Sequence, residues 1–85
     1  MKKVTVYSTT TCPYCVMVKR WLAERGIEFE DVLVDKDPAM AKKMVELSGQ
    51  MGVPFTTIED DESEQIQGIL GFNIPSLTQA LGLLY

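Results

Sequence analysis

Residues 4–15, Val4-Thr5-Val6-Tyr7-Ser8-Thr9-Thr10-Thr11-Cys12-Pro13-Tyr14-Cys15, place two cysteines where an expected strand meets an expected helix. The segment 4–7 alternates with a period of two and is rich in β-forming residues, which predicts a strand ending near Ser8. Pro13 suits the first position of a helix and Gly26 the position just after its end. We therefore predict a helix over about Pro13–Arg25, in which Val18, Trp21, Leu22 and Arg25 share one face.

The next segment predicts a second strand and a second helix. Residues 27–35 have the composition of a strand, but the alternation slips at Asp31, which indicates a bulge or a change of register. Asp37 and Pro38 supply a helix cap and a first helical residue, and Gly49 supplies a stop. The helical spacing of the apolar residues in this second helix predicts that they fill the core: Met40, Met44 and Leu47.

The last third of the chain predicts a hairpin followed by a helix. Residues 55–59 and 65–70 are typical of two short strands, joined by an acidic, solvated tip at residues 60–63. Asn73 is expected to cap the final helix, which tolerates Pro75 in its first turn. Its apolar face is expected to hold Ile74, Leu77 and Leu81.

The predicted order of elements is β-α-β-α-β-β-α, an α/β arrangement. Its first half is a βαβ unit with a right-handed crossover, and its second half is a hairpin and a helix. We expect a four-stranded mixed sheet packed with three helices. A length of 85 residues has room for one domain, which we place at residues 1–85.

Composition excludes several classes of function. The net charge is −4, with 8 Lys and Arg against 12 Asp and Glu, whereas a nucleic-acid-binding face would be basic. The chain has no histidine, so a Ser-His or Cys-His dyad cannot form. The sequence shows neither a secretory signal nor an apolar run of membrane-spanning length. We expect a cytoplasmic protein whose chemistry comes largely from sulfur.

The spacing of the two cysteines favours reversible disulfide chemistry. Side chains three positions apart on a helix are neighbours, so a small adjustment makes or breaks the bond. At the N-cap, Cys12 would accept hydrogen bonds from the free N–H groups of Tyr14 and Cys15, which favours the thiolate and lowers the pKa of Cys12. We therefore expect Cys12 to be the nucleophile and the more shielded Cys15 to be the resolving cysteine.

Two other uses of the cysteine pair are open. A purely structural disulfide would close so small a loop that it would remove little entropy from the unfolded chain. A zinc site would need two further ligands, which without histidine or more cysteines would be carboxylates or would come from a second subunit. A Cys-x-x-Cys beside a βαβ pattern is instead typical of a redox motif, and we expect no metal ligands.

The sequence resembles the glutaredoxins over nearly its whole length. Residues 7–15 resemble their active-site loop with its Cys-Pro-Tyr-Cys motif, residues 35–38 the start of their second helix, and residues 48–54 the segment leading to their Val-Pro. The last stretch is most similar to small bacterial glutaredoxin-like proteins and to redoxins that supply electrons to ribonucleotide reductase. The resemblance implies a thioredoxin fold with a cis Val53–Pro54 bond opposite the cysteines.

The resemblance also implies a glutathione site. The backbone of Val53 would pair with the glutathione peptide, and Gln50 would hold its glycine carboxylate. Gly71 is the preferred match for the glycine that helps to receive the γ-glutamyl end, with Gly68 as the competitor. The full set of implied contacts is Thr11, Pro13, Tyr14, Gln50, Val53, Pro54, Gly71, Phe72 and Asn73.

The resulting prediction is a thiol-disulfide oxidoreductase that reduces protein or glutathione mixed disulfides, with glutathione as co-substrate and no tightly bound cofactor. Its rival is a redoxin recharged by thioredoxin reductase, with ribonucleotide reductase as a client. Thr9 favours the rival, because glutaredoxins commonly carry a lysine there. An alternative of another class is a scaffold for an iron-sulfur cluster or zinc. We expect a monomer.

Overall fold

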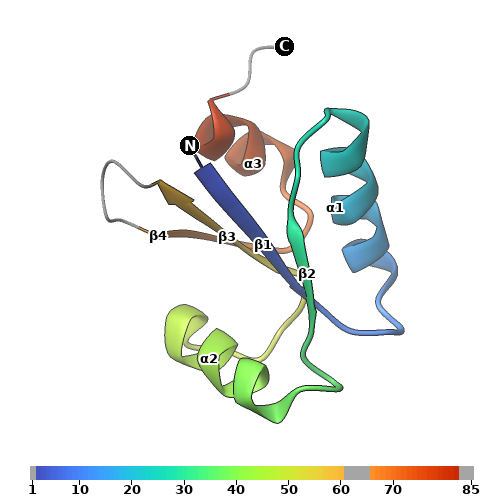
Figure 1. Cartoon of the computed structure of the whole chain (residues 1–85), viewed down its shortest axis with the longest axis vertical. Coiled ribbons are helices and arrows are strands. Elements are labelled where there is room, and N and C mark those ends of the chain that lie inside the picture. The colour runs from blue at the N-terminus through green and yellow to red at the C-terminus, as the bar shows by residue number, and fades with distance from the viewer. Residues whose placement is uncertain (1, 61–65, 83–85) are drawn as a thin grey trace.

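The computed structural model describes residues 2–60 and 66–82, which form a mixed sheet with helices on both faces (Figure 1). Its elements follow the predicted order. Their bounds are β1 (Lys2–Ser8), α1 (Pro13–Glu24), β2 (Glu30–Leu33), α2 (Pro38–Ser48), β3 (Phe55–Asp60), β4 (Ile66–Leu70) and α3 (Ile74–Leu81).

The sheet has the strand order β2-β1-β3-β4. β1 runs parallel to β2 and antiparallel to β3, and β4 runs antiparallel to β3. The parallel pair requires a crossover, which α1 provides, whereas β3 and β4 are neighbours along the chain. The ends of β1 and β3 meet where Tyr7 pairs with Phe55, and this end of the sheet carries the cysteine loop.

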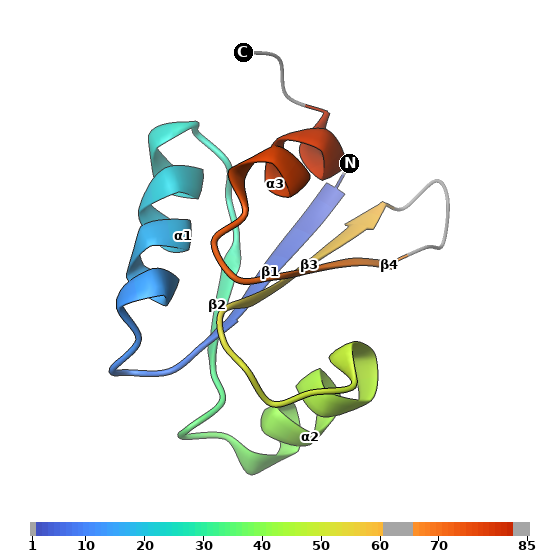
Figure 2. The same cartoon turned by 180° about the vertical axis from the view of Figure 1, so that it is seen from behind.

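Two apolar clusters cover the two faces of the sheet. On one face, α1 and α3 pack against β1, β3 and β4, and the fully buried Leu22 and Leu77 lie in this cluster. On the other face, Met44 of α2 packs against Tyr7, Val32 and Phe55. Figures 1 and 2 show α2 separated from the other two helices. The alternation of side chains along β1 produces this division, because neighbouring residues of a strand point to opposite faces.

The second strand is shorter than the sequence pattern predicts. β2 covers residues 30–33 rather than 27–35, because the N–H of Ile27 still bonds to the carbonyl of Leu22 at the end of α1, 3.0 Å away. The predicted bulge is wrong, since β2 pairs with β1 one residue to one residue through Asp31. A turn over residues 34–36 ends the strand.

Three smaller differences concern single residues. α1 ends at Glu24, and Arg25, expected on its buried face, is exposed with its guanidinium carbon 4.1 Å from the Trp21 ring centroid. Leu47 is 41% exposed, so the predicted core face of α2 reduces to Met44 and the half-buried Met40. Asp60 belongs to β3 rather than to the hairpin tip, and residues 61–65, which hold the rest of that tip, lie outside the described part.

Candidate functional site

The two cysteines lie at the N-terminus of α1, where Cys12 is the N-cap and Pro13 the first helical residue. Cys12 has extended backbone angles, and its Sγ accepts a hydrogen bond from the N–H of Cys15 at 3.1 Å. The predicted capping arrangement is therefore present, with Cys15 as the donor. Proline suits this position because it lacks an N–H where the helix would leave one unpaired.

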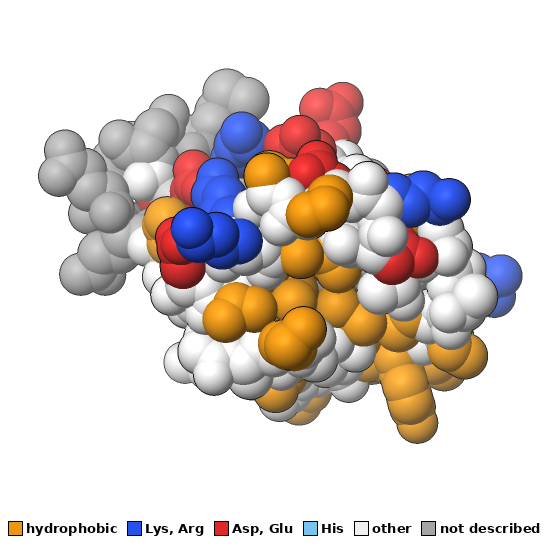
Figure 3. All heavy atoms as spheres, turned by 90° about the horizontal axis from the view of Figure 1, so that it is seen from below, with side chains coloured by type: hydrophobic (Ala, Val, Ile, Leu, Met, Phe, Trp, Pro, Cys, Tyr) orange, Lys and Arg blue, Asp and Glu red, His pale blue; other side chains and the backbone are white. Residues whose placement is uncertain are grey.

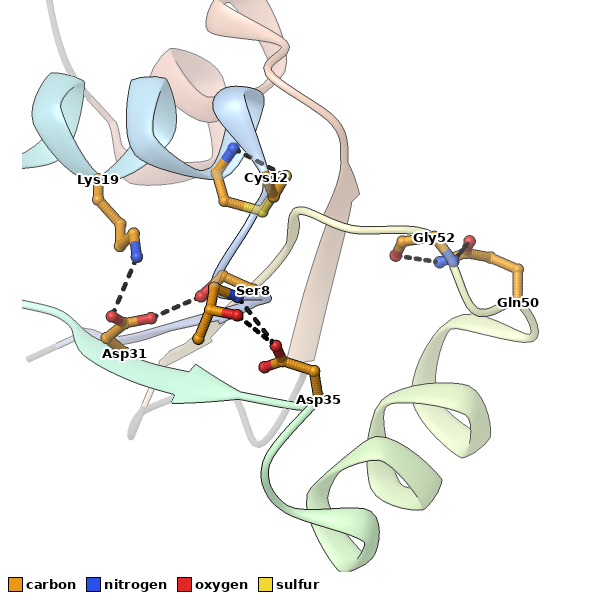
Figure 4. Close-up of a disulfide and its surroundings, with 9 residues drawn as sticks. Ser8, Cys12, Lys19, Asp31, Asp35, Gln50 and Gly52 are labelled. Atoms are coloured by element: carbon orange, nitrogen blue, oxygen red, sulfur yellow. Dashed lines mark hydrogen bonds and ion pairs between the residues drawn. A yellow bond between two sulfur atoms is a disulfide. The ribbon is translucent and has the colours of Figure 1, made fainter.

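A disulfide joins Cys12 to Cys15, and their Cα atoms are 5.2 Å apart (Figure 4). This separation falls within the usual range for disulfides. Cys12 is half-buried, whereas Cys15 has no exposed surface. An incoming sulfur can therefore approach the Sγ of Cys12, while the body of the protein covers Cys15.

The bond between Val53 and Pro54 is cis, as the resemblance implied. Pro54 is buried and Val53 half-buried, and the carbonyl of Pro54 accepts a hydrogen bond from the N–H of Gly71 at 2.8 Å. Because Pro54 directly precedes β3, this turn lies at the same end of the sheet as the cysteine loop. The hydrogen bond ties the turn to the end of β4.

A polar network beside the disulfide was missed by sequence reasoning (Figure 4). One carboxylate oxygen of Asp31 accepts a hydrogen bond from the buried Ser8 hydroxyl at 2.7 Å, and the other lies 3.1 Å from Nζ of Lys19. The network joins β1, β2 and α1. The break in alternation at Asp31 was its sequence signal, because Asp31 stands where the alternation of the preceding residues would place an apolar side chain.

A second pair of contacts anchors the loop that precedes Cys12. The backbone N–H and the hydroxyl of Thr10 both donate to Oδ2 of Asp35, at 3.2 and 2.6 Å. These bonds, the hydroxyl's first, hold the pKa of the Asp35 carboxyl below its usual value, with a smaller contribution from the charge of Lys36. The loop is thereby tied to the turn between β2 and α2.

Asp35→Asn tests this anchor through its pH dependence. Because the pKa of Asp35 is lowered on folding, ionised Asp35 stabilises the fold above the unfolded value of 3.8, and this contribution disappears as the pH falls through the lower folded value. We expect the wild type to exceed the variant in free energy of unfolding near neutral pH, with the difference shrinking in acid. Urea unfolding over a pH series measures it. A difference that stays constant throughout the acid range would contradict the assignment. Thr10→Val, which removes the hydroxyl partner of Asp35, is the control.

The residues implied to bind glutathione differ in their surroundings. Most of them lie around Cys12 or at the cis turn, but the polar group of one is already hydrogen-bonded elsewhere. Thr11, Pro13 and Tyr14 lie exposed around Cys12, and Val53 and Pro54 lie at the cis turn. The amide of Gln50 is instead turned into its own loop, where it bonds to the hydroxyl of Ser48 and to the backbone N–H and carbonyl of Gly52.

Two of the implied residues after β4 have structural tasks. Asn73 caps α3 by accepting a hydrogen bond from the N–H of Ser76 at 3.2 Å. Phe72 packs against the apolar cluster under α1 and α3. Both residues therefore contribute to the fold whether or not a ligand is bound.

The two competing glycines have different reasons to be glycine. Gly71 has a φ of 80°, a conformation that favours glycine, and it directly follows β4. Gly68 lies inside β4 opposite Thr57, where an added Cβ would collide with the ring of Phe55. Glycine is therefore favoured at position 68 by close packing against Phe55, and at position 71 by the backbone conformation of the turn.

The described residues offer neither a cluster of metal ligands nor a membrane span. Within residues 2–60 and 66–82, no group of three or more His, Cys, Asp or Glu residues could hold a metal ion. Over the same ranges, no helix is both long and apolar enough to cross a membrane.

Comparison with known proteins relates this geometry to a family. The family model described as glutaredoxin matches residues 4–63. The glutaredoxin-like protein NrdH of Lactococcus lactis subsp. lactis is 40% identical over 57 residues, which cover 67% of this chain and 78% of that protein. Glutaredoxin 3 of Escherichia coli is 35% identical over 59 residues, which cover 69% and 71% of the two chains.

Solved structures agree with the sequence comparisons. The glutaredoxin-like NrdH-redoxin of Escherichia coli superimposes with a TM-score of 0.73 at 26% identity, covering 91% of this chain and 92% of the other. The four-stranded mixed sheet with three helices is thus a thioredoxin-like fold. With the Cys-Pro-Tyr-Cys pair at the head of α1 and a family match over residues 4–63, this chain belongs to the glutaredoxin family.

Proposed function

We propose that this glutaredoxin-family thiol oxidoreductase reduces disulfides in client proteins and is itself reduced by a disulfide reductase of the thioredoxin reductase type. Cys12 is the nucleophile and Cys15 the resolving cysteine. The observation that carries the assignment of roles is the difference in exposure across the disulfide, with Cys12 half-buried at the N-cap and Cys15 fully covered.

The proposed cycle moves two electrons. The Cys12 thiolate attacks one sulfur of the client disulfide, and the other client sulfur leaves as a thiolate that takes up a proton. Cys15 then loses its proton and attacks Sγ of Cys12. The second client sulfur leaves as a thiolate that takes up a proton, and the Cys12–Cys15 disulfide forms. The reductase returns two electrons and one proton to the pair, which restores the Cys12 thiolate and the Cys15 thiol. The cycle needs no bound cofactor.

The position of Cys12 at the N-cap of α1 favours its thiolate form. The N–H of Cys15 already donates to Sγ of Cys12 in the disulfide form, and the N-terminal end of the α1 dipole favours negative charge. A thiolate is a better acceptor than a thiol, so reduction should strengthen this interaction. These contacts favour the thiolate form of Cys12 over the thiol once the disulfide is reduced.

Two features favour a protein reductant over glutathione. Thr9 stands where the family commonly has a lysine for a glutathione carboxylate. The amide of Gln50 is occupied within its own loop. A hydrogen bond to a charged group contributes about 1.5–3 kcal/mol, so the loss of one such contact weakens binding about tenfold or more.

Exposed apolar side chains on α1 and in the loop before the cis turn also suit an apolar protein surface. Tyr14 is 62% exposed, Val16 54% and Met51 79%. Figure 3 views the end of the molecule that carries α2 and the cysteine loop, and hydrophobic side chains form a band across it. The NrdH-redoxin of Escherichia coli, which shares this fold, is described as having a thioredoxin-like activity profile.

Glutathione-linked reduction is the second candidate. It is favoured by the Cys-Pro-Tyr-Cys motif and by the 35% identity to glutaredoxin 3 of Escherichia coli. In that case glutathione would attack the mixed disulfide or the Cys12–Cys15 disulfide, and glutathione reductase would complete the cycle. The two candidates differ in the electron donor and not in the roles of the cysteines.

A coupled assay separates the two candidates. The oxidised protein is incubated with NADPH and either thioredoxin reductase or glutathione with glutathione reductase, with insulin or ribonucleotide reductase as the disulfide client. We expect NADPH oxidation to be about tenfold faster or more with thioredoxin reductase, which corresponds to one lost charged contact with glutathione. Faster turnover with glutathione would overturn this choice. Thr9→Lys is the matched variant, and it is expected to raise the glutathione-dependent rate selectively.

A further inference from the structure

The C-terminal quarter of the chain has no charged side chain. All 8 Lys and Arg and all 12 Asp and Glu residues lie before residue 65, although 24% of the chain is charged. The described part of this segment is β4 and α3, residues 66–82. The glutaredoxin family model ends at residue 63, so this neutral surface lies outside the matched region.

β4 is an edge strand without the usual protection against pairing. Among the described residues it pairs with β3 alone, whereas β2, at the other edge of the sheet, carries Glu30 and Asp31. Charged residues and prolines on edge strands normally prevent association. The sequence of β4 contains neither, and its exposed apolar residues Ile66 and Leu70 are 48% and 54% accessible.

A polar but uncharged groove runs beside this edge. It lies between β4 and α3, and its lining includes Gln67, Ser76 and Gln79. Amide and hydroxyl side chains both donate and accept hydrogen bonds, so a groove of this kind is complementary to a second copy of itself. An added strand at the edge of β4 would run along this groove.

We propose that two copies of this chain associate through their β4 edges, which pair antiparallel about a two-fold axis centred on Gly68. This register places Ile66 of each copy opposite Leu70 of the other, on the same face of the sheet. Both apolar side chains would lose water contact, and cross-strand apolar pairs of this kind stabilise a sheet. The two four-stranded sheets would become one continuous sheet.

The charge distribution favours a second copy of this chain as the partner that binds at the β4 edge. The net charge of −4 resides entirely outside β4 and α3, so two copies can meet at this surface without bringing like charges together. The two-fold pairing uses the same surface on both copies, as symmetric dimers do.

The disulfide lies away from this edge of the sheet. Cys12 lies at the start of α1, which follows β1, and β3 separates β1 from β4 in the sheet. The edge and the groove form a small contact, so we expect a weak dimer at high concentration and, at low concentration, the monomer expected from the sequence. In such a dimer the Cys12–Cys15 pair of each copy would react independently of the other copy.

Sedimentation velocity of the oxidised full chain from about 10 μM to about 1 mM covers the range of weak interfaces. We expect a reversible shift from monomer to dimer with concentration. Ile66→Lys should weaken self-association about tenfold or more, because it places a charge opposite Leu70. Val16→Lys is the matched control, since Val16 is exposed to a similar degree on α1, and it should leave self-association unchanged.

Mixing two variants tests the register itself. Ile66→Lys and Leu70→Glu should each be monomeric alone, but their equimolar mixture should form a heterodimer, because the introduced ammonium and the introduced carboxylate would then lie opposite each other. Recovery on mixing also shows that both variants are folded. Hydrogen exchange should show protection of residues 66–70 that increases with protein concentration. A wild type that is monomeric throughout, a mixture that stays monomeric, or protection that appears only when the reductase or client is added would overturn the proposal.

Discussion

Cys12→Ser is expected to abolish disulfide exchange, whereas Cys15→Ser should retain the first half of the cycle. A serine hydroxyl is not ionised at neutral pH, so turnover should fall by roughly a thousandfold or more. Serine is a good N-cap residue, which should preserve the start of α1. Cys15→Ser leaves Sγ of Cys12 accessible, and it should form a stable mixed disulfide with a client or with glutathione. Insulin reduction and mass spectrometry of trapped complexes measure the two steps.

The double variant, Cys12→Ser with Cys15→Ser, is the control for background exchange. It should behave as Cys12→Ser does, because Cys15 has no exposed surface through which it could react without its partner. Equal loss of mixed-disulfide formation in the two single variants would contradict the assigned roles. Trapping of a client through Cys15 in the Cys12→Ser variant would reverse them.

Leu22→Ala should produce a large loss of stability. Leu22 is fully buried between α1 and the sheet, where it belongs to the cluster that also contains Val6 and Leu77. Truncation of such a side chain leaves a cavity and costs about 2–5 kcal/mol in free energy of unfolding. For a chain of this size the melting temperature should fall by roughly 4–8 °C per kcal/mol. Urea and thermal unfolding of the oxidised protein measure the loss.

Val16→Ala is the matched control for Leu22→Ala, because both residues lie on α1 but Val16 is 54% exposed. Its effect should stay within about 0.5 kcal/mol, as is usual for surface substitutions. Equal effects of the two substitutions would show that α1 does not depend on this cluster for its attachment to the sheet. The attachment matters for function because α1 carries both cysteines.

Local patterns predicted most element boundaries because caps and stops act within one helical turn. Asp37 and Asn73 cap α2 and α3 as expected, and Gly49 ends α2 with a φ of 73°. The prediction of β2 was too long, because a hydrogen bond between Ile27 and Leu22 extends the end of α1. That contact competes with strand pairing, and it cannot be inferred from the amino acids of residues 27–29.

Side-chain partners were less predictable than elements. Asp31 interrupts the alternation of apolar and polar residues, which suggested a bulge. The strand nevertheless pairs regularly, and the Asp31 carboxylate bonds to Ser8 and Lys19. Those partners come from β1 and α1, and only packing brings them together. Gln50 was expected to face a ligand, but a two-residue spacing lets its amide bond to Gly52 instead. A polar side chain takes whichever partner lies within reach, and that depends on the folded loop.

The kind of chemistry can be inferred from the amino acids alone: two cysteines three residues apart, a proline between them at the start of a helix, and no histidine to support other nucleophilic chemistry. The order of strands and helices is also a local property, since it follows from hydrophobic periodicity and capping. Three features needed the folded molecule: which sulfur is covered, which carboxylate anchors the cysteine loop, and which edge of the described sheet carries no charge. Burial and pairing depend on residues far apart in the chain, and these meet only when the sheet and its helices have assembled.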